Sequence, residues 1–237
     1  MDNINHFYLI STLLRGKFFV SPDYAIAAGS QVANILNRDW DGMPTTDLEK
    51  QTNRAKLPIA AVSYDKEVFS SYDAAPEGST ALIPLKGSML KYGTWCTYGT
   101  EEVAAMINAA AMHRKINSIV LDIDSGGGSV DSVAPIVQAI KFSQSQDKPV
   151  VASVDMACSA AYWAASQCNS IIADNNISAT IGSIGVMMSF WDVKGYYEAQ
   201  GYKLHVVYAP ESDSKNLPFE KALEGEYDLI KTEELSP

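Results

Sequence analysis

The sequence predicts an α/β fold with a mainly parallel sheet, and two observations lead to this prediction. From about residue 81 onward, short apolar runs alternate with longer segments of helical periodicity, in the order expected of consecutive βαβ units. Hydrophobic residues make up 47% of the 237 residues, which is enough to fill a sizeable core. We therefore expect parallel strands with helices packed outside them.

The chain before residue 81 has a different character. Residues 1–70 are predicted to form a mostly helical N-terminal segment, with a helix over 21–36 that Ser21 can cap. Residues 71–80 contain Pro, Gly and Ser and are typical of a linker. The main domain is then expected to occupy residues 81–237.

Within that domain, strands and helices follow each other in strict alternation. Period-3.6 stripes of apolar residues define the helices, and β-branched runs define the strands. The predicted strands cover 80–87, 117–124, 148–156, 169–174 and 202–209. The predicted helices cover 100–114, 129–144, 159–168 and 189–201. Ligands bind beyond the carboxyl ends of the strands in such sheets, where the stretches 124–129 and 156–161 are expected to lie.

Charge and cysteine usage exclude several classes of protein. The net charge of −10 argues against nucleic acid or an anionic membrane as a partner. Three cysteines are an odd count without metal-ligand spacing, as expected of reduced thiols in the cytosol. No apolar run reaches the roughly 18–20 residues of a membrane span, and the N-terminus lacks the charge order of a signal peptide. The sequence thus predicts a soluble cytoplasmic protein without metal or cofactor.

The stretch "DIDSGGGS" (122–129) follows a predicted strand. It lacks the third glycine of a dinucleotide-binding loop and the Gly-Lys-Ser/Thr of a phosphate-binding loop. Two interpretations stay open. The stretch is either a flexible turn or an oxyanion hole, since glycines let backbone N–H groups face a pocket without obstruction by Cβ.

Ser159 lies in "MACSAAYW", where a predicted strand becomes a helix. A serine at this position is either a helix cap or a nucleophile, with the N–H of Ala160 helping to hold an oxyanion. Cys158 is a rival nucleophile, although nothing near it in the sequence indicates activation.

A nucleophilic serine needs a base. None of the three histidines, His6, His113 and His205, stands in a context typical of catalysis, which disfavours a Ser-His-Asp triad. A neutral lysine can serve instead, but composition alone does not select one. In "ATIGSIGVMM" (179–188), Ser183 belongs either to a kinked core segment or to a hydrogen bond that orients such a base.

Taken together, four ordered stretches resemble the S49 family of serine peptidases, the signal peptide peptidase A group. The resemblance covers about residues 80–220 and implies the ClpP/crotonase-like fold. The stretches are "LDIDSGGGSV", "VASVDMACSAAYWAAS", "IADNNISATIGSIGVMM" and "GYKLHVVYAPESDSKN". The third, which is similar to the family's Thr-Gly-Ser-Ile-Gly-Val segment, is the most specific.

The resemblance implies a role for five residues. Ser159 takes the position of the nucleophile, Lys215 that of the general base, and Ser183 that of the serine that hydrogen-bonds the lysine. Gly127 and Ala160 take the positions of the two oxyanion-hole amides. The activity implied is that of a Ser-Lys endopeptidase, which becomes more active as pH rises because only a neutral amine accepts a proton.

This sequence departs from the family pattern in three places. Asp124 and Gly126 replace the usual Asn and Pro of the glycine-rich loop, which affects its stiffness but removes no amide donor. Alanines replace two glycines after Ser159. The stretch before Lys215 is about two residues longer than in cellular members, which keeps Lys203 as a rival base.

The N-terminal stretch "LISTLLRGKFFVSPDYA" resembles the leader of phage and prophage members, which process capsid and scaffold proteins during head maturation. We therefore expect a polypeptide substrate of that kind, a homo-oligomer, and a location in the host cytoplasm or procapsid. Relatives usually continue past "KTEELSP", so a chain truncated at the C-terminus is also expected. The alternatives are a cellular S49 peptidase without an anchor, a crotonase-like acyl-CoA enzyme, and an inert assembly protein of the same fold.

Overall fold

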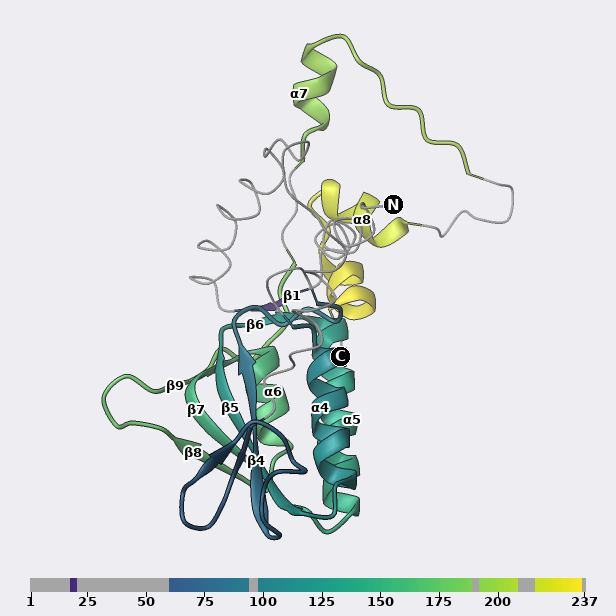
Figure 1. Ribbon diagram of the computed structural model, residues 1–237. Helices are drawn as coiled ribbons and strands as arrows, with labels where there is room; N and C mark the ends of the chain where they lie inside the picture. Colours follow the sequence, from purple (N-terminus) through teal and green to yellow (C-terminus); the bar gives the residue numbers. More distant parts are fainter. Residues whose placement is uncertain (1–17, 21–59, 94–97, 189–191, 209–215, 236–237) are drawn as a thin grey trace, which may run out of the picture. The chain divides into compact units, whose positions relative to one another are not determined.

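The computed structural model describes residues 18–20, 60–93, 98–188, 192–208 and 216–235, and Figure 1 shows the helices and strands that they form. The chain divides into two compact units, Met1–Gly185 and Val186–Pro237. The predicted helix over 21–36 and the predicted base Lys215 lie outside the described residues.

The first unit contains the sheet. Its strands are β1 (Phe18–Val20), β2 (Ala60–Val62), β3 (Val68–Phe69), β4 (Ser79–Lys86), β5 (Ile116–Ser125), β6 (Gly127–Ser129), β7 (Val150–Cys158), β8 (Ser170–Ala173) and β9 (Thr180–Gly182). The helices among its described residues are α4 (Thr100–Met112), the 3₁₀ turn η1 (Val130–Ser132), α5 (Val133–Ser145) and α6 (Ala160–Ser166). The four strands predicted between residues 80 and 174, and the helices between them, are therefore confirmed in order and approximate extent.

Among the described residues, the main sheet has seven strands in the order β3-β2-β4-β5-β7-β8, and β9 also pairs with β7. The strands from β4 onward pair in parallel, whereas β2 pairs antiparallel with both β3 and β4. The sheet is therefore mixed. β2 and β3 precede the predicted linker at 71–80 in the chain, and both belong to the main sheet. The sheet therefore contains strands from both sides of that linker.

Helices cover one face of this sheet. The strands β4, β5, β7 and β8 lie side by side in chain order, and right-handed crossovers between such strands place every connecting helix on the same face. Figure 1 shows α4, α5 and α6 together on that side. Along β4, β5 and β7, buried residues mostly alternate with half-buried ones, as expected of a sheet covered more fully on one face.

The core lies between the helices and the sheet. Its largest fully buried side chains come from β4, β5 and β7 and from the facing sides of α4 and α5. They include Ile83, Met106, Ile107, Ile119, Leu121, Ile123, Ile136, Ile140, Val150 and Val154. Burying each such side chain contributes about 1.5–3 kcal/mol, so this layer fixes where the strands end and thus where a site can form.

The second unit holds α7 (Lys194–Ala199), α8 (Leu217–Leu223) and the π-helical turn η2 (Ile230–Glu234). Of the helix predicted over 189–201, the described residues 192–201 are helical at Lys194–Ala199. The strand predicted over 202–209 is not formed in the described residues 202–208, where the side chains of Leu204 and Val207 are 78% and 91% exposed. A β-branched run favours a strand, but the strand forms only where a neighbouring strand supplies hydrogen bonds. Among the helices described in either unit, none has both the length and the apolar character needed to cross a membrane.

Candidate active site

Ser159 lies at the point where β7 ends and α6 begins, without an intervening loop. Its backbone has φ 55° and ψ −115°, a region that residues with a Cβ rarely adopt. Two backbone hydrogen bonds hold it there: the Ser159 N–H donates to the Gly182 carbonyl at 2.8 Å, and the Trp163 N–H donates to the Ser159 carbonyl at 2.9 Å. Such a conformation costs about 1–3 kcal/mol and persists where the surroundings enforce it, often at functional sites.

The hydroxyl of Ser159 does not cap α6. Its Oγ lies 3.5 Å from the Gly185 carbonyl oxygen, at the long limit of a hydrogen bond, and the residue is 4% exposed. The helix-cap interpretation of this serine therefore has no support in the structure. The sharp turn instead separates the hydroxyl from the backbone groups that a capping serine would bind.

The register of the sheet brings the predicted site segments together at the carboxyl ends of the strands. Ser125 of β5 is paired with Ala157 of β7, and both strands run in the same direction. Gly127 lies two residues after Ser125, and Ser159 lies two residues after Ala157. On the other side of β7, Cys158 is paired with Gly182 of β9. The glycine-rich stretch and the Ser159 turn therefore meet at the carboxyl ends of the strands, as the sequence predicts, and the stretch around Ser183 joins them there through β9.

Glycine is required in β6 for two separate reasons. Gly127 has φ +100°, which strains any residue with a Cβ. At Gly128 the constraint is space, since a Cβ would lie 1.9 Å from the backbone oxygen of Met89. The β6 segment is therefore a built strand with close backbone neighbours, and the interpretation of this stretch as a flexible turn is wrong.

The predicted oxyanion amide of Gly127 has a partner in this structure. Its N–H donates to Ser125 Oγ at 3.2 Å, and the same hydroxyl donates to the Gly87 carbonyl at 2.6 Å. Ser125 is fully buried. The hydroxyl thus fixes the orientation of the Gly127 peptide group, a role that sequence reasoning missed because a serine before three glycines looks like part of a loop.

Ser183 lies in a segment with an unusual backbone. Gly182, Ser183 and Gly185 all have positive φ, at 144°, 53° and 144°. Ser183 is exposed, and its predicted role in orienting a base stays a prediction. The segment contributes to the site through its backbone, because the Gly182 carbonyl holds the Ser159 turn.

Lys215 is the predicted general base, and Lys203 is its rival. Lys215 lies outside the described residues, and Lys203 is an exposed residue of the second unit. The general base therefore stays a prediction from the sequence.

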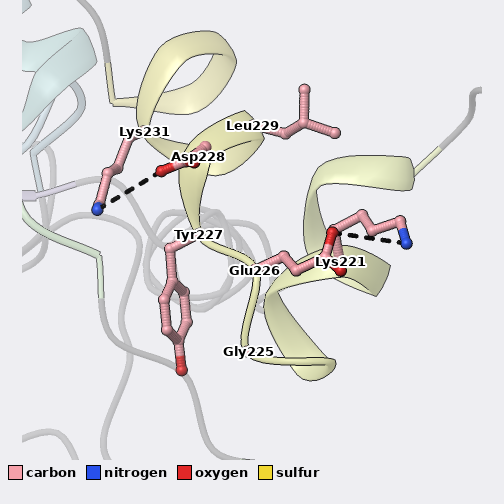
Figure 2. Close-up of a pocket in the computed structure, with 7 residues that line it drawn as sticks. All are labelled: Lys221, Gly225, Glu226, Tyr227, Asp228, Leu229 and Lys231. Atoms are coloured by element: carbon pink, nitrogen blue, oxygen red, sulfur yellow. Dashed lines mark ion pairs between the residues drawn. The ribbon is translucent and has the colours of Figure 1, made fainter.

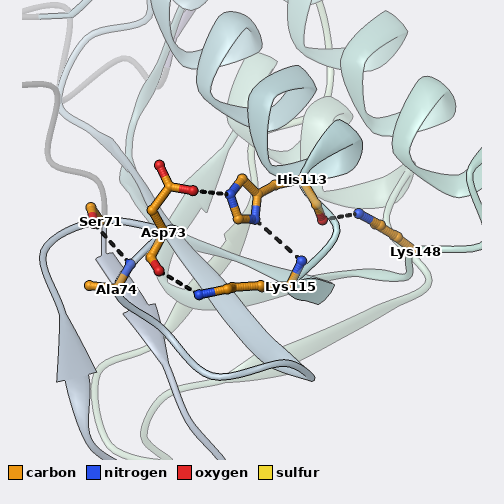
Figure 3. Close-up of polar contacts among 6 residues, drawn as sticks. All are labelled: Ser71, Asp73, Ala74, His113, Lys115 and Lys148. Atoms are coloured by element: carbon orange, nitrogen blue, oxygen red, sulfur yellow. Dashed lines mark hydrogen bonds and ion pairs between the residues drawn. The ribbon is translucent and has the colours of Figure 1, made fainter.

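His113 lies just before the start of β5, at the opposite end of the strands from Ser159. It ends α4 just before β5, a strand of ten residues that spans about 30 Å. Figure 3 shows its contacts: Nε2 lies 3.2 Å from Asp73 Oδ1, Nδ1 accepts the Lys115 N–H at 3.3 Å, and the carbonyl accepts Lys148 Nζ at 2.6 Å. His113 thus ties the 71–75 segment to the end of α4 and cannot act as the base for Ser159.

The rival nucleophile Cys158 is not activated. It is 4% exposed, and burial raises the pKa of its thiol. Burial also raises the pKa of Cys168, to about 12. Since the thiolate is the nucleophilic form of cysteine, both thiols are less reactive than a free cysteine near neutral pH. This leaves Ser159 as the candidate nucleophile of the segment.

A hollow of about 430 Å³ lies in the second unit, between α8 and η2 (Figure 2). It is lined by Lys221, Gly225, Glu226, Tyr227, Asp228, Leu229 and Lys231. Lys221 pairs with Glu224 at 2.9 Å and with Glu226 at 3.6 Å, and Lys231 lies 4.0 Å from Asp228. Its charges neutralise each other locally, and we assign no chemistry to it.

Comparison with known proteins identifies the segment that carries Ser159. Residues 142–226 match the family model of Peptidase family S49. The chain is 33% identical over 135 residues to "Head-tail preconnector protein GP5" of Enterobacteria phage P21, covering 54% of this chain and 26% of that protein. It is 34% identical over 127 residues to "Protease 4" of Salmonella typhi, covering 52% and 20%.

A plant protein matches over a longer part of the chain. "Serine protease SPPA, chloroplastic" of Arabidopsis thaliana is 28% identical over 202 residues, which cover 80% of this chain and 28% of that protein. The chain thus spans about a quarter of the length of the phage and plant relatives, and a fifth of Protease 4. The matched family segment includes Ser159, Ser183, Lys203 and Lys215. The resemblance to family S49 is confirmed.

Proposed function

We propose that this chain, whose residues 142–226 match the model of peptidase family S49, is a serine endopeptidase with Ser159 as its nucleophile. One observation carries the proposal: Ser159 is held at φ 55° in a turn that leads from a strand directly into a helix. A strained strand-to-helix turn presents a serine hydroxyl at the end of a sheet and directs the following N–H toward the same space. That following residue is Ala160.

The reaction would proceed in two halves. The Ser159 hydroxyl attacks the peptide carbonyl carbon and gives its proton to neutral Lys215, while the carbonyl oxygen becomes an oxyanion. The amides of Ala160 and Gly127 would hold this oxyanion, and one such donor is worth about 10²–10³-fold in rate. Protonated Lys215 then gives its proton to the departing amine as the C–N bond breaks. Water hydrolyses the acyl-enzyme by the reverse proton transfers, with Ser183 orienting the lysine.

The test is peptide cleavage by full-length Ser159→Ala and Lys215→Ala variants, with Lys203→Ala as the matched control. We expect Ser159→Ala to lower kcat/KM by at least about 10³-fold and Lys215→Ala by about 10²–10⁴-fold. Lys203→Ala should stay within about threefold of the wild type, and the wild-type rate should rise with pH. Circular dichroism checks that each variant is folded.

Two outcomes would contradict this mechanism. Unchanged cleavage by Ser159→Ala would remove the serine peptidase proposal altogether. Loss of activity in Lys203→Ala with full activity in Lys215→Ala would assign the base to Lys203 and keep the nucleophile.

We further propose that the substrates are phage scaffold and capsid proteins, processed in the host cytoplasm or the procapsid. The support is the phage relative, named as a head-tail preconnector protein, together with the phage-like N-terminal stretch. Incubation with the scaffold and capsid proteins encoded beside this chain should yield discrete fragments, and the Ser159→Ala variant should yield none. Equal cleavage of an unrelated unfolded protein would point to a general degradative peptidase instead.

The ClpP/crotonase-like fold and a homo-oligomeric state belong to the same proposal. The edge of the main sheet beyond β7 is formed by β8 and then β9, which pair with successive parts of β7. Isoleucines of these two strands expose large fractions of their surface: Ile171 at 36% and Ile172 at 57% in β8, and Ile181 at 45% in β9. Exposed apolar side chains gathered along one edge are typical of a protein interface, and a second copy of the chain fits this site.

A further inference from the structure

The short strand β1 lies against the glycine-rich strand β6. The two pair antiparallel, with Phe18 opposite Ser129, Phe19 opposite Gly128, and Val20 opposite Gly127. Figure 1 shows β1, in purple, beside β6 at the end of the sheet where β7 gives way to α6. A segment near residue 20 therefore pairs with the strand that contains Gly127, the predicted oxyanion-hole glycine.

Only one side of β6 is available for this pairing. On the other side, the Met89 N–H donates to the Gly127 carbonyl at 2.9 Å, and the Ser129 N–H donates to the Met89 carbonyl at 2.9 Å. Successive residues of a strand direct their peptide groups to opposite sides. The N–H and C=O of Gly128 therefore point away from Met89 and toward Phe19 of β1.

This side of β6 suits an extended peptide backbone. Gly127 and Gly128 carry no side chains, so a strand added here is bound through main-chain groups and selected little by sequence. Peptides commonly bind proteins in this manner, as an extra strand on an exposed edge. Gly127 occupies the same level of the sheet as Ser159, because Ser125 and Ala157 are paired two residues earlier. A substrate strand on β6 would thus run past the nucleophile.

From this arrangement we propose that Phe18–Val20 occupies, within the same chain, the position that a substrate strand takes on β6, and so acts as a built-in competitive inhibitor. The proposal rests on the proposed peptidase function for its consequence, though not for the binding itself. One edge accepts one strand, so substrate and β1 exclude each other. Because β1 belongs to the same chain, it competes intramolecularly, and a substrate strand has to overcome that competition.

The length of β1 makes the inhibition reversible. Of the three residues of β1, only Phe19 directs its N–H and C=O toward β6, so the strand forms few main-chain hydrogen bonds with it. Each such bond contributes only modestly to net stability. A longer substrate strand that also contacts the surroundings of Ser159 can therefore displace β1.

A pair of proline variants in the full-length chain tests the proposal. Phe19→Pro removes the N–H that faces Gly128. Phe18→Pro removes an N–H that faces away from β6, because peptide groups alternate along a strand, and so serves as the matched control. We expect Phe19→Pro to lower KM for a peptide substrate about three- to tenfold relative to Phe18→Pro, with kcat unchanged.

A binding measurement separates this inference from the peptidase proposal. The two proline changes are placed in the inactive Ser159→Ala chain, and the probe is a fluorescein-labelled peptide GKFFVSP, copied from residues 16–22. Anisotropy should show binding about three- to tenfold tighter to the Phe19→Pro chain than to the Phe18→Pro chain. If the peptide binds more tightly to the Phe19→Pro chain, but the protein that retains Ser159 cleaves no peptide, the inhibitory strand is supported and the peptidase function is contradicted. Equal binding by both proline variants would overturn the inference, whatever the cleavage results.

Discussion

The backbone of Ser159 is held in a conformation that the residue would not choose by itself. Its N–H is fixed by the Gly182 carbonyl and its carbonyl by the Trp163 N–H, at the junction of β7 and α6. Strain of this kind belongs to the residue, since it depends on the Cβ at that position. It also has a measurable consequence, because glycine adopts positive φ without the same penalty.

We predict that the free energy of unfolding of Ser159→Gly exceeds that of Ser159→Ala by about 1 kcal/mol. Glycine avoids the strain of this conformation, which is about 1–3 kcal/mol, but the greater conformational entropy of glycine in the unfolded chain offsets part of the gain. Both variants lack the hydroxyl, so both should be inactive. Urea unfolding followed by circular dichroism gives the difference in the free energy of unfolding. Equal midpoints would show that the turn at Ser159 is not strained.

At the scale of the element, β6 is the strand on which the site depends. It pairs with Met89 on one side and with β1 on the other. Gly127 is required for its positive φ, and Gly128 is required because Met89 leaves no space for a Cβ. The strand is fully buried. A change in its backbone therefore reaches the oxyanion position as well as the pairing with β1.

We expect Gly128→Ala to lower the free energy of unfolding by about 1–3 kcal/mol, because the new Cβ would meet the Met89 oxygen at 1.9 Å and the backbone must shift. Peptidase activity should fall with it. The control is Gly195→Ala in α7, where the added Cβ meets no atom within 4 Å and alanine favours a helix by up to about 1 kcal/mol. Thermal unfolding of the two variants should shift in opposite directions, and a fully stable Gly128→Ala would contradict the close approach of Met89.

At the scale of the whole molecule, the two edges of the main sheet differ. One edge is the short strand β3, and the other is formed by β8 and β9, along which exposed isoleucines gather. An edge strand with exposed apolar side chains invites pairing with another chain unless it is covered. The proposed homo-oligomer would cover the β8–β9 edge.

Ile172→Asp should therefore lower the sedimentation coefficient of the full-length protein, by placing a charge in the proposed interface. Val68→Asp on β3 is the matched control, since Val68 is also an exposed apolar residue (70% against 57%) but lies on the opposite edge. Analytical ultracentrifugation of both variants and the wild type decides the question. A wild-type monomer, or equal dissociation by both changes, would remove the β8–β9 edge as the interface.

Much of the site could be predicted from the order of short motifs. Parallel strands end on the same side of the sheet, so the stretches that follow β5 and β7 were expected to meet there, and the pair Ser125–Ala157 confirms it. That the stretch around Ser183 joins them, through the pair Cys158–Gly182, was not predicted. The strand predicted over 202–209 was wrong for the described residues 202–208. Their apolar β-branched run favours a strand, but it has no partner strand among the described residues. Local preference indicates what a segment can form, whereas pairing decides what it does form.

The sequence by itself determined the alternation of strands and helices, the position of Ser159 at a strand-to-helix junction, and the resemblance of the segment that carries it to peptidase family S49. The tertiary structure decided three further features: the left-handed backbone of Ser159, the close packing of Met89 on Gly128, and the pairing of Phe18–Val20 with β6. Each of these depends on contacts between residues far apart in the chain. Periodicity and spacing report only on neighbours in sequence, so no local pattern could have revealed that the start of the chain pairs with the strand beside its own candidate nucleophile.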